Sequence, residues 1–171
     1  DILVNIKHNV KKIVVASSMS IYGEGQYLCE KCNKSQFPSI RNTSQLKNKI
    51  WDFKCKTCGE LLKPIPTNEE KPIKPTSIYA MTKHHQEEMC LLIGKTYGLP
   101  ITALRYFNAY GPGQSISNPY TGVASIFLSR ILAGKNPYIF EDGMQQRDFI
   151  HVSDIAQANL LALTNSSGNY R

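Results

Sequence analysis

Short apolar runs alternate with helical patterns along most of this chain, and this alternation limits the fold more than any other feature. Residues 12–17 and 101–105 are apolar runs of the length typical of buried strands. A long helix is predicted over residues 77–96, and an amphipathic helix over residues 121–133. Strands that alternate with helices predict an α/β fold with a largely parallel sheet.

Shorter elements are expected around these. We predict a loop over residues 108–120, a short strand over 138–140 and a turn at 141–143. A last helix is expected to begin at Ser153, whose side chain can cap it, and to run to about residue 164.

Four of the five cysteines form two pairs, Cys29-x-x-Cys32 and Cys55-x-x-Cys58, with 22 residues between the pairs. This spacing presents four thiolates as two chelating turns, which suits a closed, tetrahedral and structural Zn²⁺ site. Two disulfides or reduced thiols are the alternatives. Residues 24–66 around these pairs are rich in Lys, Asn and Ser. We therefore predict a small zinc-ribbon-like insertion whose fold depends on the metal.

The chain carries 20 Lys and Arg against 13 Asp and Glu, a formal charge of +7. This balance fits a phosphorylated small molecule, a nucleic acid, an anionic membrane or simply a solvated surface. Nucleic acid is not favoured, because no basic run is interleaved with aromatic residues. No membrane span is expected, because no stretch approaches 18 consecutive apolar residues. The metal-type cysteine spacing, without a signal-peptide pattern, predicts a cytoplasmic protein.

Tyr79 and Lys83 are four residues apart in the predicted long helix, so their side chains share one helical face. A phenol is a poor base at neutral pH because its pKa is about 10, and a neighbouring ammonium lowers that pKa. The pair is therefore a candidate general acid and base, with a surface contact as the alternative. Ser17 and Ser18 stand where a buried strand ends, the edge at which open α/β sheets bind ligands. A hydroxyl there can bind a substrate hydroxyl or merely close a turn.

Four motifs follow one another along the chain. They are Val-Val-Ala-Ser-Ser-Met-Ser-Ile-Tyr-Gly at 14–23, Tyr-x-x-x-Lys at 79–83, Leu-Arg-Tyr-Phe-Asn-Ala-Tyr-Gly-Pro-Gly-Gln at 104–114 and Arg-Asp-Phe-Ile-His-Val-Ser-Asp at 147–154. In this order they resemble the extended short-chain dehydrogenases/reductases, and more narrowly the NAD-dependent nucleotide-sugar epimerases and dehydratases. The resemblance implies part of a Rossmann-like, doubly wound parallel sheet, NAD as the cofactor and a nucleotide-diphosphate sugar as the substrate.

The insertion narrows this resemblance. Its two cysteine pairs follow Tyr-Gly-Glu-Gly at 22–25, and Ser-Asn-Pro-Tyr-Thr-Gly at 117–122 and Phe-Glu-Asp-Gly at 140–143 come later. The combination is similar to the dTDP-L-rhamnose 4-epimerase branch of the family. UDP-glucose and UDP-glucuronate 4-epimerases are the alternatives, since the choice of sugar depends on pocket shape.

The resemblance implies a role for each matching residue. Tyr79 matches the catalytic tyrosine that takes a proton from a sugar hydroxyl, and Lys83 matches the lysine that binds the nicotinamide ribose and activates that tyrosine. Ser18 matches the catalytic serine that hydrogen-bonds the reacting hydroxyl. Ser17 and Tyr106 are expected to bind the cofactor with Tyr79 and Lys83, although strand-end packing explains Tyr106 equally well.

Three further residues are expected to bind the substrate, namely Asn108, Asn118 and Arg147. The resemblance places Arg147 at the nucleotide diphosphate, a role that suits guanidinium because it donates two parallel hydrogen bonds to phosphate. From the residues alone, Asn108 can equally occupy a turn, and Arg147 can pair with Asp148 or Asp154.

Met19 and Ser20 bear on the type of reaction. In the 4,6-dehydratases of this family an acidic pair stands at these positions and eliminates water. Neither Met nor Ser can serve as that acid or base. The resemblance therefore implies epimerisation at C4 through a transient 4-keto sugar, without net redox change.

The sequence also departs from the family pattern. No Gly-x-x-Gly-x-x-Gly follows an early strand, and the first residue is not Met. We therefore expect a central fragment: part of the NAD-binding domain at 1–23, the insertion at 24–66, and the rest of that domain with the start of the substrate-binding region at 67–171. Such a fragment is expected to bind NAD poorly, and the full-length protein to form a homodimer. A zinc-binding interaction module on an inactive scaffold is the alternative function.

Overall fold

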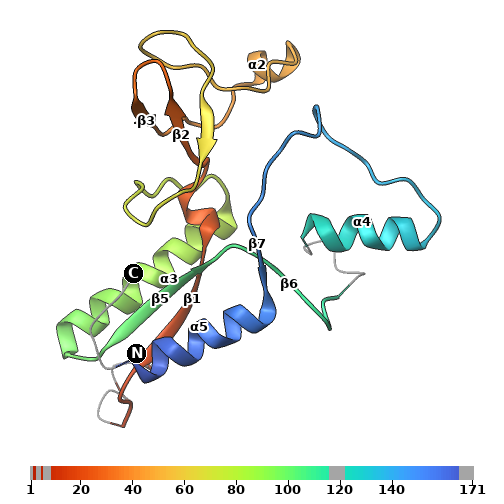
Figure 1. Ribbon diagram of the computed structural model, residues 1–171. Helices are drawn as coiled ribbons and strands as arrows, with labels where there is room; N and C mark the ends of the chain where they lie inside the picture. Colours follow the sequence, from red (N-terminus) through yellow and green to blue (C-terminus); the bar gives the residue numbers. More distant parts are fainter. Residues whose placement is uncertain (1, 3–4, 6–8, 116–121, 166–171) are drawn as a thin grey trace. The chain divides into compact units, whose positions relative to one another are not determined.

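The computed structural model describes residues 2, 5, 9–115 and 122–165. Strands and helices alternate along most of the chain (Figure 1). They group into two compact units, of which one combines the chain up to Ser18 with the chain from Gln86 onward. The other unit is Met19–His85. Within the described residues, no helix combines the length and the apolar character needed to cross a membrane.

The first unit is built on two parallel strands, β1 (Ile13–Ser18) and β5 (Ile101–Tyr106). Their register places Ser18 opposite Tyr106, so both strands end at the same edge. The strands are rich in β-branched residues, which favour extended backbone and pack well on a pleated surface. We call their buried apolar cluster the parallel-strand core; its members are Val15, Leu99, Ile101 and Ala103. Both predicted strands are confirmed.

Helix α3 (Ile78–Tyr97) confirms the predicted long helix, and its second half covers the parallel-strand core. Cys90 of this helix packs against the core. Gly94 permits the close approach, because a Cβ there would lie 2.7 Å from the carbonyl oxygen of Leu99 and 2.9 Å from Cγ1 of Ile101. The helix therefore sits directly over the start of β5.

The rest of the first unit contains a second pair of parallel strands and two helices. These elements are β6 (Asn108–Tyr110), α4 (Val123–Leu132), β7 (Phe149–His151) and α5 (Val152–Thr164). Helix α5 contacts β1 and β5 as well as β6 and β7. The α/β alternation predicted from the sequence is therefore confirmed.

Two local predictions are wrong. Residues 138–140 form no strand, because their side chains are exposed and Tyr138 instead stacks on the guanidinium of Arg130, 4.0 Å from the ring centroid. Residues 108–120 were expected to be a loop, but they begin with β6, which pairs with a strand more than 30 residues away.

The start of the last helix also differs from the prediction. Its N-cap is His151, whose Nδ1 accepts a hydrogen bond from the backbone N–H of Ser153 at 3.3 Å. Ser153 therefore lies inside the first turn instead of capping it. The general preference for serine at N-caps is outweighed here by the imidazole acceptor two residues earlier.

The second unit contains a small antiparallel sheet in the order β3-β2-β4, below the loops at the top of Figure 1. Its elements are η1 (Met19–Tyr22, a 3-10 helix), β2 (Gln26–Cys29), β3 (Lys34–Gln36), α2 (Thr43–Lys47) and β4 (Lys63–Ile65). Its buried cluster consists of Cys29, Cys55 and Leu62. Two of these three side chains are cysteines, so little apolar surface holds this sheet together.

Candidate functional site

Helix α3 carries the predicted Tyr79 and Lys83 in its first two turns. The helix is capped by Ser77, whose Oγ accepts a hydrogen bond from the backbone N–H of Ala80 at 3.1 Å. Ala80 is fully buried, whereas the Tyr79 side chain is 57% exposed. The cap and the buried alanine thus fix the first turn, and the four-residue spacing sets Tyr79 and Lys83 on one face as predicted.

Ser17 and Ser18 lie at the end of β1, as expected, and both are buried. The parallel register places Ser17 opposite Arg105 and Ser18 opposite Tyr106. The carboxyl ends of parallel strands share one edge of the sheet. The predicted Ser17, Ser18 and Tyr106 therefore lie at this edge together with Arg105.

Glu87 is a buried residue at this edge that the sequence prediction missed. Its carboxylate accepts hydrogen bonds from Arg105 Nη2 at 2.6 Å and Arg105 Nε at 3.1 Å, and from Ser17 Oγ at 2.6 Å. The side chains of Glu87 and Arg105 are only 1% and 6% exposed. The paired, fully hydrogen-bonded geometry offsets the desolvation that burial imposes on both charges. Helix α3 is thereby tied to the ends of β1 and β5.

A sequence signal for Glu87 was present, since it stands four residues after Lys83 on the same helical face. Nothing in the sequence says that this position is buried. The Ser17 hydroxyl hydrogen is committed to Glu87. A cofactor-binding role for Ser17 stays a prediction. In the structure its hydroxyl helps to hold the Glu87 carboxylate in place.

The side chain of Tyr106 connects β5 with helix α5. Its hydroxyl donates to Asn159 Oδ1 at 2.8 Å, and Asn159 Nδ2 donates to the carbonyl of Ile155 at 2.7 Å. This contact is the strand-end packing that was the alternative for Tyr106. Contact of Tyr106 with a cofactor stays a prediction.

Two of the three predicted substrate-binding residues lie where the pairing of β6 with β7 begins: Asn108 is the first residue of β6, and Arg147 precedes β7 by two residues. Asn108 donates from both its backbone N–H and its side-chain Nδ2 to the carbonyl of Asp148, at 3.2 and 2.9 Å. Arg147 is the preceding residue in the chain, so the structure brings the Asn108 and Arg147 segments together. The Arg147 guanidinium donates to the carbonyl of Gln146 at 2.7 Å. Among the described residues it forms no ion pair with an aspartate. Asn118 lies outside the described residues.

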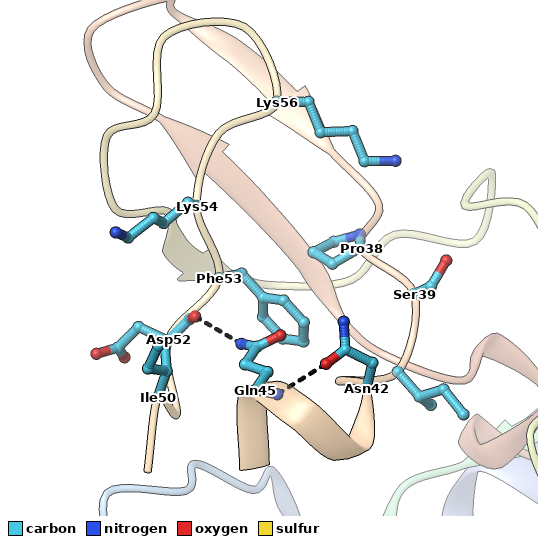
Figure 2. Close-up of a pocket in the computed structure, with 10 residues that line it drawn as sticks. Pro38, Ser39, Asn42, Gln45, Ile50, Asp52, Phe53, Lys54 and Lys56 are labelled. Atoms are coloured by element: carbon cyan, nitrogen blue, oxygen red, sulfur yellow. Dashed lines mark hydrogen bonds between the residues drawn. The ribbon is translucent and has the colours of Figure 1, made fainter. Parts of the chain in front are cut away.

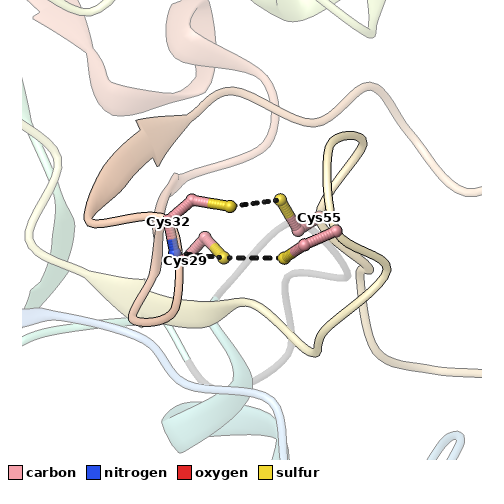
Figure 3. Close-up of side chains that lie close together, drawn as sticks. Cys29, Cys32 and Cys55 are labelled. Atoms are coloured by element: carbon pink, nitrogen blue, oxygen red, sulfur yellow. Dashed lines mark hydrogen bonds between the residues drawn. The ribbon is translucent and has the colours of Figure 1, made fainter.

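The four paired cysteines come together as predicted, and we call them the cysteine cluster (Cys29, Cys32, Cys55 and Cys58). Their Sγ atoms all lie within 4.8 Å of one another (Figure 3). The Sγ separation is 3.5 Å between Cys29 and Cys58 and 3.9 Å between Cys32 and Cys55. In a tetrahedral site with Zn–S bonds of about 2.3 Å, the sulfurs are about 3.8 Å apart. The donor set and its spacing therefore fit a zinc ion.

The surroundings of the sulfur atoms also favour a bound cation. Hydrogen bonds from the backbone N–H groups of Cys58 and Thr57 lower the pKa of Cys55 to about 6. Hydrogen bonds with the sulfurs of Cys58 and Cys29 raise the pKa of Cys32 to about 12. Four thiolates this close repel one another, so the full set ionises together only when a cation compensates the charge.

Gln36 lies beside the cysteine cluster and was not predicted. Its Nε2 donates to Cys55 Sγ at 2.8 Å, and its Oε1 accepts from the backbone N–H of Lys56 at 3.3 Å. Such outer contacts orient ligand atoms and tune them. Gln36 therefore connects β3 to the second cysteine pair.

The insertion also has an open pocket, lined by parts of residues 38–42, helix α2 and residues 50–56 (Figure 2). Phe53 and Ile50 supply apolar surface, and the Lys56 side chain extends at the rim. Hydrogen bonds from Gln45 to Asn42 Oδ1 and to the Asp52 carbonyl hold its base. Of the described residues predicted to act on a sugar, none lines this pocket.

A known protein family matches the part of the chain that carries the predicted acid–base residues. The model of the NAD dependent epimerase/dehydratase family matches residues 55–170, which include Tyr79, Lys83 and Glu87. The chain belongs to the NAD dependent epimerase/dehydratase family. The expected Rossmann-like fold is thereby confirmed.

Two known proteins resemble this chain over nearly its whole length. A dTDP-L-rhamnose 4-epimerase from Burkholderia thailandensis is 35% identical over 161 residues, which cover 92% of this chain and 42% of that protein. A UDP-N-acetylglucosamine 4-epimerase from Methanobrevibacter ruminantium, in complex with UDP-N-acetylmuramic acid, has a TM-score of 0.70 and 31% identity, covering 98% of this chain and 43% of that one.

A second solved structure shares the same fold. The UDP-glucose 4-epimerase from Thermotoga maritima with UDP-glucose has a TM-score of 0.68 and 29% identity, covering 97% of this chain and 42% of that one. The chain thus spans about two fifths of the length of these three proteins.

Proposed function

We propose that the protein is an NAD-dependent nucleotide-sugar 4-epimerase and that this chain supplies its acid–base residues. The observation that carries the proposal is the capped helix α3, which presents Tyr79 and Lys83 on one face and is anchored through Glu87 to the strand end that bears Ser18. Family membership and the epimerases among its relatives support it.

In this proposal each residue of the chain has one task. Tyr79 removes the proton from the C4 hydroxyl of the sugar, and Ser18 hydrogen-bonds the same hydroxyl and orients it. Lys83 stabilises the tyrosinate and binds the ribose of the cofactor. When bound, NAD supplies the acceptor for the C4 hydride and later returns the hydride. Tyr79 gives its proton back to the 4-keto oxygen once the opposite face of the sugar is presented, so C4 is inverted without net redox change.

The remaining residues hold the two ligands. Lys83 is proposed as the charged contact to the cofactor, with Ser17 and Tyr106 at the adjoining strand ends. Arg147 is proposed to bind the diphosphate, with Asn108 and Asn118 near the sugar. The Arg147 guanidinium is exposed and makes no ion pair with an aspartate among the described residues, which supports a role at a bound anion.

The test is Tyr79→Phe in the protein, with Tyr97→Phe at the other end of the same helix as the matched control. Loss of the phenolic proton acceptor should lower kcat by about 10²–10⁴ while circular dichroism stays unchanged. The control should retain full activity. Unchanged turnover by Tyr79→Phe would overturn the proposal and favour the alternative, a zinc-binding interaction module on an inactive scaffold.

We propose dTDP-L-rhamnose as the sugar nucleotide, supported by the Burkholderia relative. The measurement is kcat/KM on a panel of dTDP-L-rhamnose, UDP-glucose, UDP-glucuronate and UDP-N-acetylglucosamine. A preference of tenfold or more for a UDP-sugar would replace this assignment and leave the 4-epimerase proposal intact.

We propose that the cysteine cluster binds one structural zinc ion, so that the insertion is a zinc ribbon. The tetrahedral sulfur spacing and the compensating charge argument support this. Metal analysis should find one zinc per chain, and Cys55→Ser should lose it. Cys90→Ser, which changes the lone cysteine of helix α3, should retain the metal. Equal zinc content in both variants would contradict the assignment.

We further propose that the protein is a homodimer and works in the cytoplasm. Exposed apolar side chains on helix α3, such as Met89 and Leu92 at 59% and 65%, support an interface, and five free cysteines support a reducing compartment. Sedimentation analysis would test the dimer, and a monomer at micromolar concentration would contradict it.

A further inference from the structure

Lys71 is a buried lysine in the segment that connects β4 with helix α3. Its residue exposure is 4%, and burial lowers its pKa, with the charge of Lys74 lowering it further and that of Glu24 raising it. Lysine is rarely this buried, because removing an ammonium from water is unfavourable unless specific partners replace the water. The groups that surround the Lys71 ammonium therefore indicate the role of this side chain.

Those partners come from two different parts of the second unit. Lys71 Nζ donates to the carbonyl oxygen of Tyr22 at 2.6 Å and to that of Pro72 at 3.2 Å. The same nitrogen lies 5.8 Å from the ring centroid of Tyr22 and 5.7 Å from that of Phe37. Both distances are within the range of cation–π attraction. Tyr22 ends the 3-10 helix η1, and Phe37 directly follows β3 of the insertion.

Phe37 leads from Lys71 to the cysteine cluster. Its neighbour in the chain is Gln36, whose side chain bonds both Cys55 Sγ and the backbone N–H of Lys56. A continuous series of contacts therefore runs from the proposed metal ligand Cys55 through Gln36 and Phe37 to Lys71, and ends at the carbonyl of Tyr22. Coupling between sites is carried by such contiguous contacts.

A second contact holds the same turn from the same connecting segment. The backbone N–H of Lys74 donates to the carbonyl of Ile21 at 2.9 Å, and Lys74 Nζ donates to Ser39 Oγ of the insertion at 2.6 Å. The carbonyl of Lys74 lies so close to Gly23 that a Cβ there would be 2.3 Å from its oxygen. The connecting segment is thus fitted tightly against the end of η1.

We propose that Lys71 is a positioning residue that makes the shape of the Met19–Tyr22 turn depend on the folded insertion. This turn directly follows Ser18, so its conformation sets how the proposed sugar-binding hydroxyl is presented. The effect on Ser18 rests on the proposed function. The test by chelation rests on the proposed zinc site. The insertion thus has a role beyond its own stability: through one buried cation it holds the turn that follows Ser18 in the chain.

The test is amide hydrogen exchange of the peptide that covers residues 19–23, with and without a zinc chelator. In the unaltered protein, chelation should raise exchange of this peptide about tenfold or more, the effect of losing a hydrogen bond to a charged group. Lys71→Met should show the raised exchange already with zinc bound, and chelation should add little. Lys71→Arg, which keeps the cation, should restore most of the protection.

Lys63→Met is the matched control. Lys63 lies in β4 and pairs on the surface with Glu30, so its loss should leave the exchange of residues 19–23 and its response to the chelator unchanged. Protection of residues 19–23 in Lys71→Met equal to that of the unaltered protein would overturn the proposal. So would an unaltered protein whose zinc is removed with no change in this peptide.

Phe37→Leu decides the outcome if Lys71→Met fails to fold or to bind zinc. This variant removes only the ring that links the insertion to Lys71, and it should raise exchange of residues 19–23 with the zinc retained. Unchanged exchange would overturn the inference. If metal analysis finds no zinc, the zinc assignment fails, and Phe37→Leu replaces chelation as the perturbation. Because the readout is hydrogen exchange, loss of the epimerase proposal would not affect this result.

Discussion

The parallel-strand core and the insertion bury different kinds of side chain. The parallel-strand core is formed by buried apolar side chains of two adjacent strands and by the helix that covers them. In the insertion the buried cluster is Cys29, Cys55 and Leu62, and partly buried side chains, among them Tyr27 and Phe53, pack against it. An apolar core forms by excluding water, whereas a cluster of thiolates needs a cation to offset the mutual repulsion of its charges. We therefore expect the insertion, unlike the parallel-strand core, to depend on a bound metal ion for its stability.

Metal removal should have the largest effect and should separate the two regions. We expect a chelator to abolish amide protection in β2, β3 and β4, because the insertion then lacks its cross-link, while β1 and β5 retain theirs. Hydrogen exchange measured by mass spectrometry on both sets of peptides checks this. Loss of protection in both regions in a single cooperative step would show that the two regions do not unfold independently.

Glu87→Gln should have the next largest effect on stability, and this effect should be confined to the first unit. The change leaves Arg105 buried without its carboxylate partner, so the free energy of unfolding of this unit should fall by about 3–5 kcal/mol. Glu88→Gln, at the exposed neighbouring position, should change it by less than about 0.5 kcal/mol. Urea denaturation followed by circular dichroism measures both. Equal stabilities of the two variants would show that the buried pair is not what ties α3 to the strands.

Ile101→Ala should test the parallel-strand core itself. Ile101 is fully buried, and its truncation should lower the free energy of unfolding by about 2–5 kcal/mol through lost burial and a residual cavity. Ile139→Ala, at an exposed site, is the matched control. Zinc content and protection of β2–β4 should stay unchanged in both variants. A loss of zinc from Ile101→Ala would contradict the independence of the two regions.

Ser77→Ala should have the smallest effect, at the start of helix α3, which extends through both units. Loss of the cap should lower the stability of the first turn by about 1 kcal/mol, because the Ala80 N–H loses its acceptor. Hydrogen exchange should rise at residues 79–83 and not at Cys90. Thr82→Ala, at an exposed position of the same turn, is the control. Raised exchange along the entire helix would show that its two halves are not independent.

Much of the local structure followed from sequence, and the reason differs between elements. The strands β1 and β5 and the helix α3 have patterns long enough to be recognised in isolation. The strands β6 and β7 have three residues each and exist through their pairing with each other. Their sequences therefore gave no sufficient local signal. The apolar pattern of residues 138–140 predicted a strand, but among the described residues no strand pairs with them.

The candidate site shows the same division. Tyr79, Lys83 and the cysteine pairs were recognised by their spacing, because a helix turn or a chelating turn has a fixed local geometry. Glu87 was missed because its significance comes from Ser17 and Arg105, which lie on strands distant in sequence.

By itself, the sequence determined the α/β class, the face shared by Tyr79 and Lys83, and the thiol set suited to zinc. Each of these depends on residues close together in the chain, whose geometry the backbone limits to a few forms. Only the tertiary structure decided that Glu87 is buried against Ser17 and Arg105, and that Lys71 lies between Tyr22 and Phe37. Burial of a charge depends on which distant segments surround it, and local sequence patterns carry no record of those neighbours.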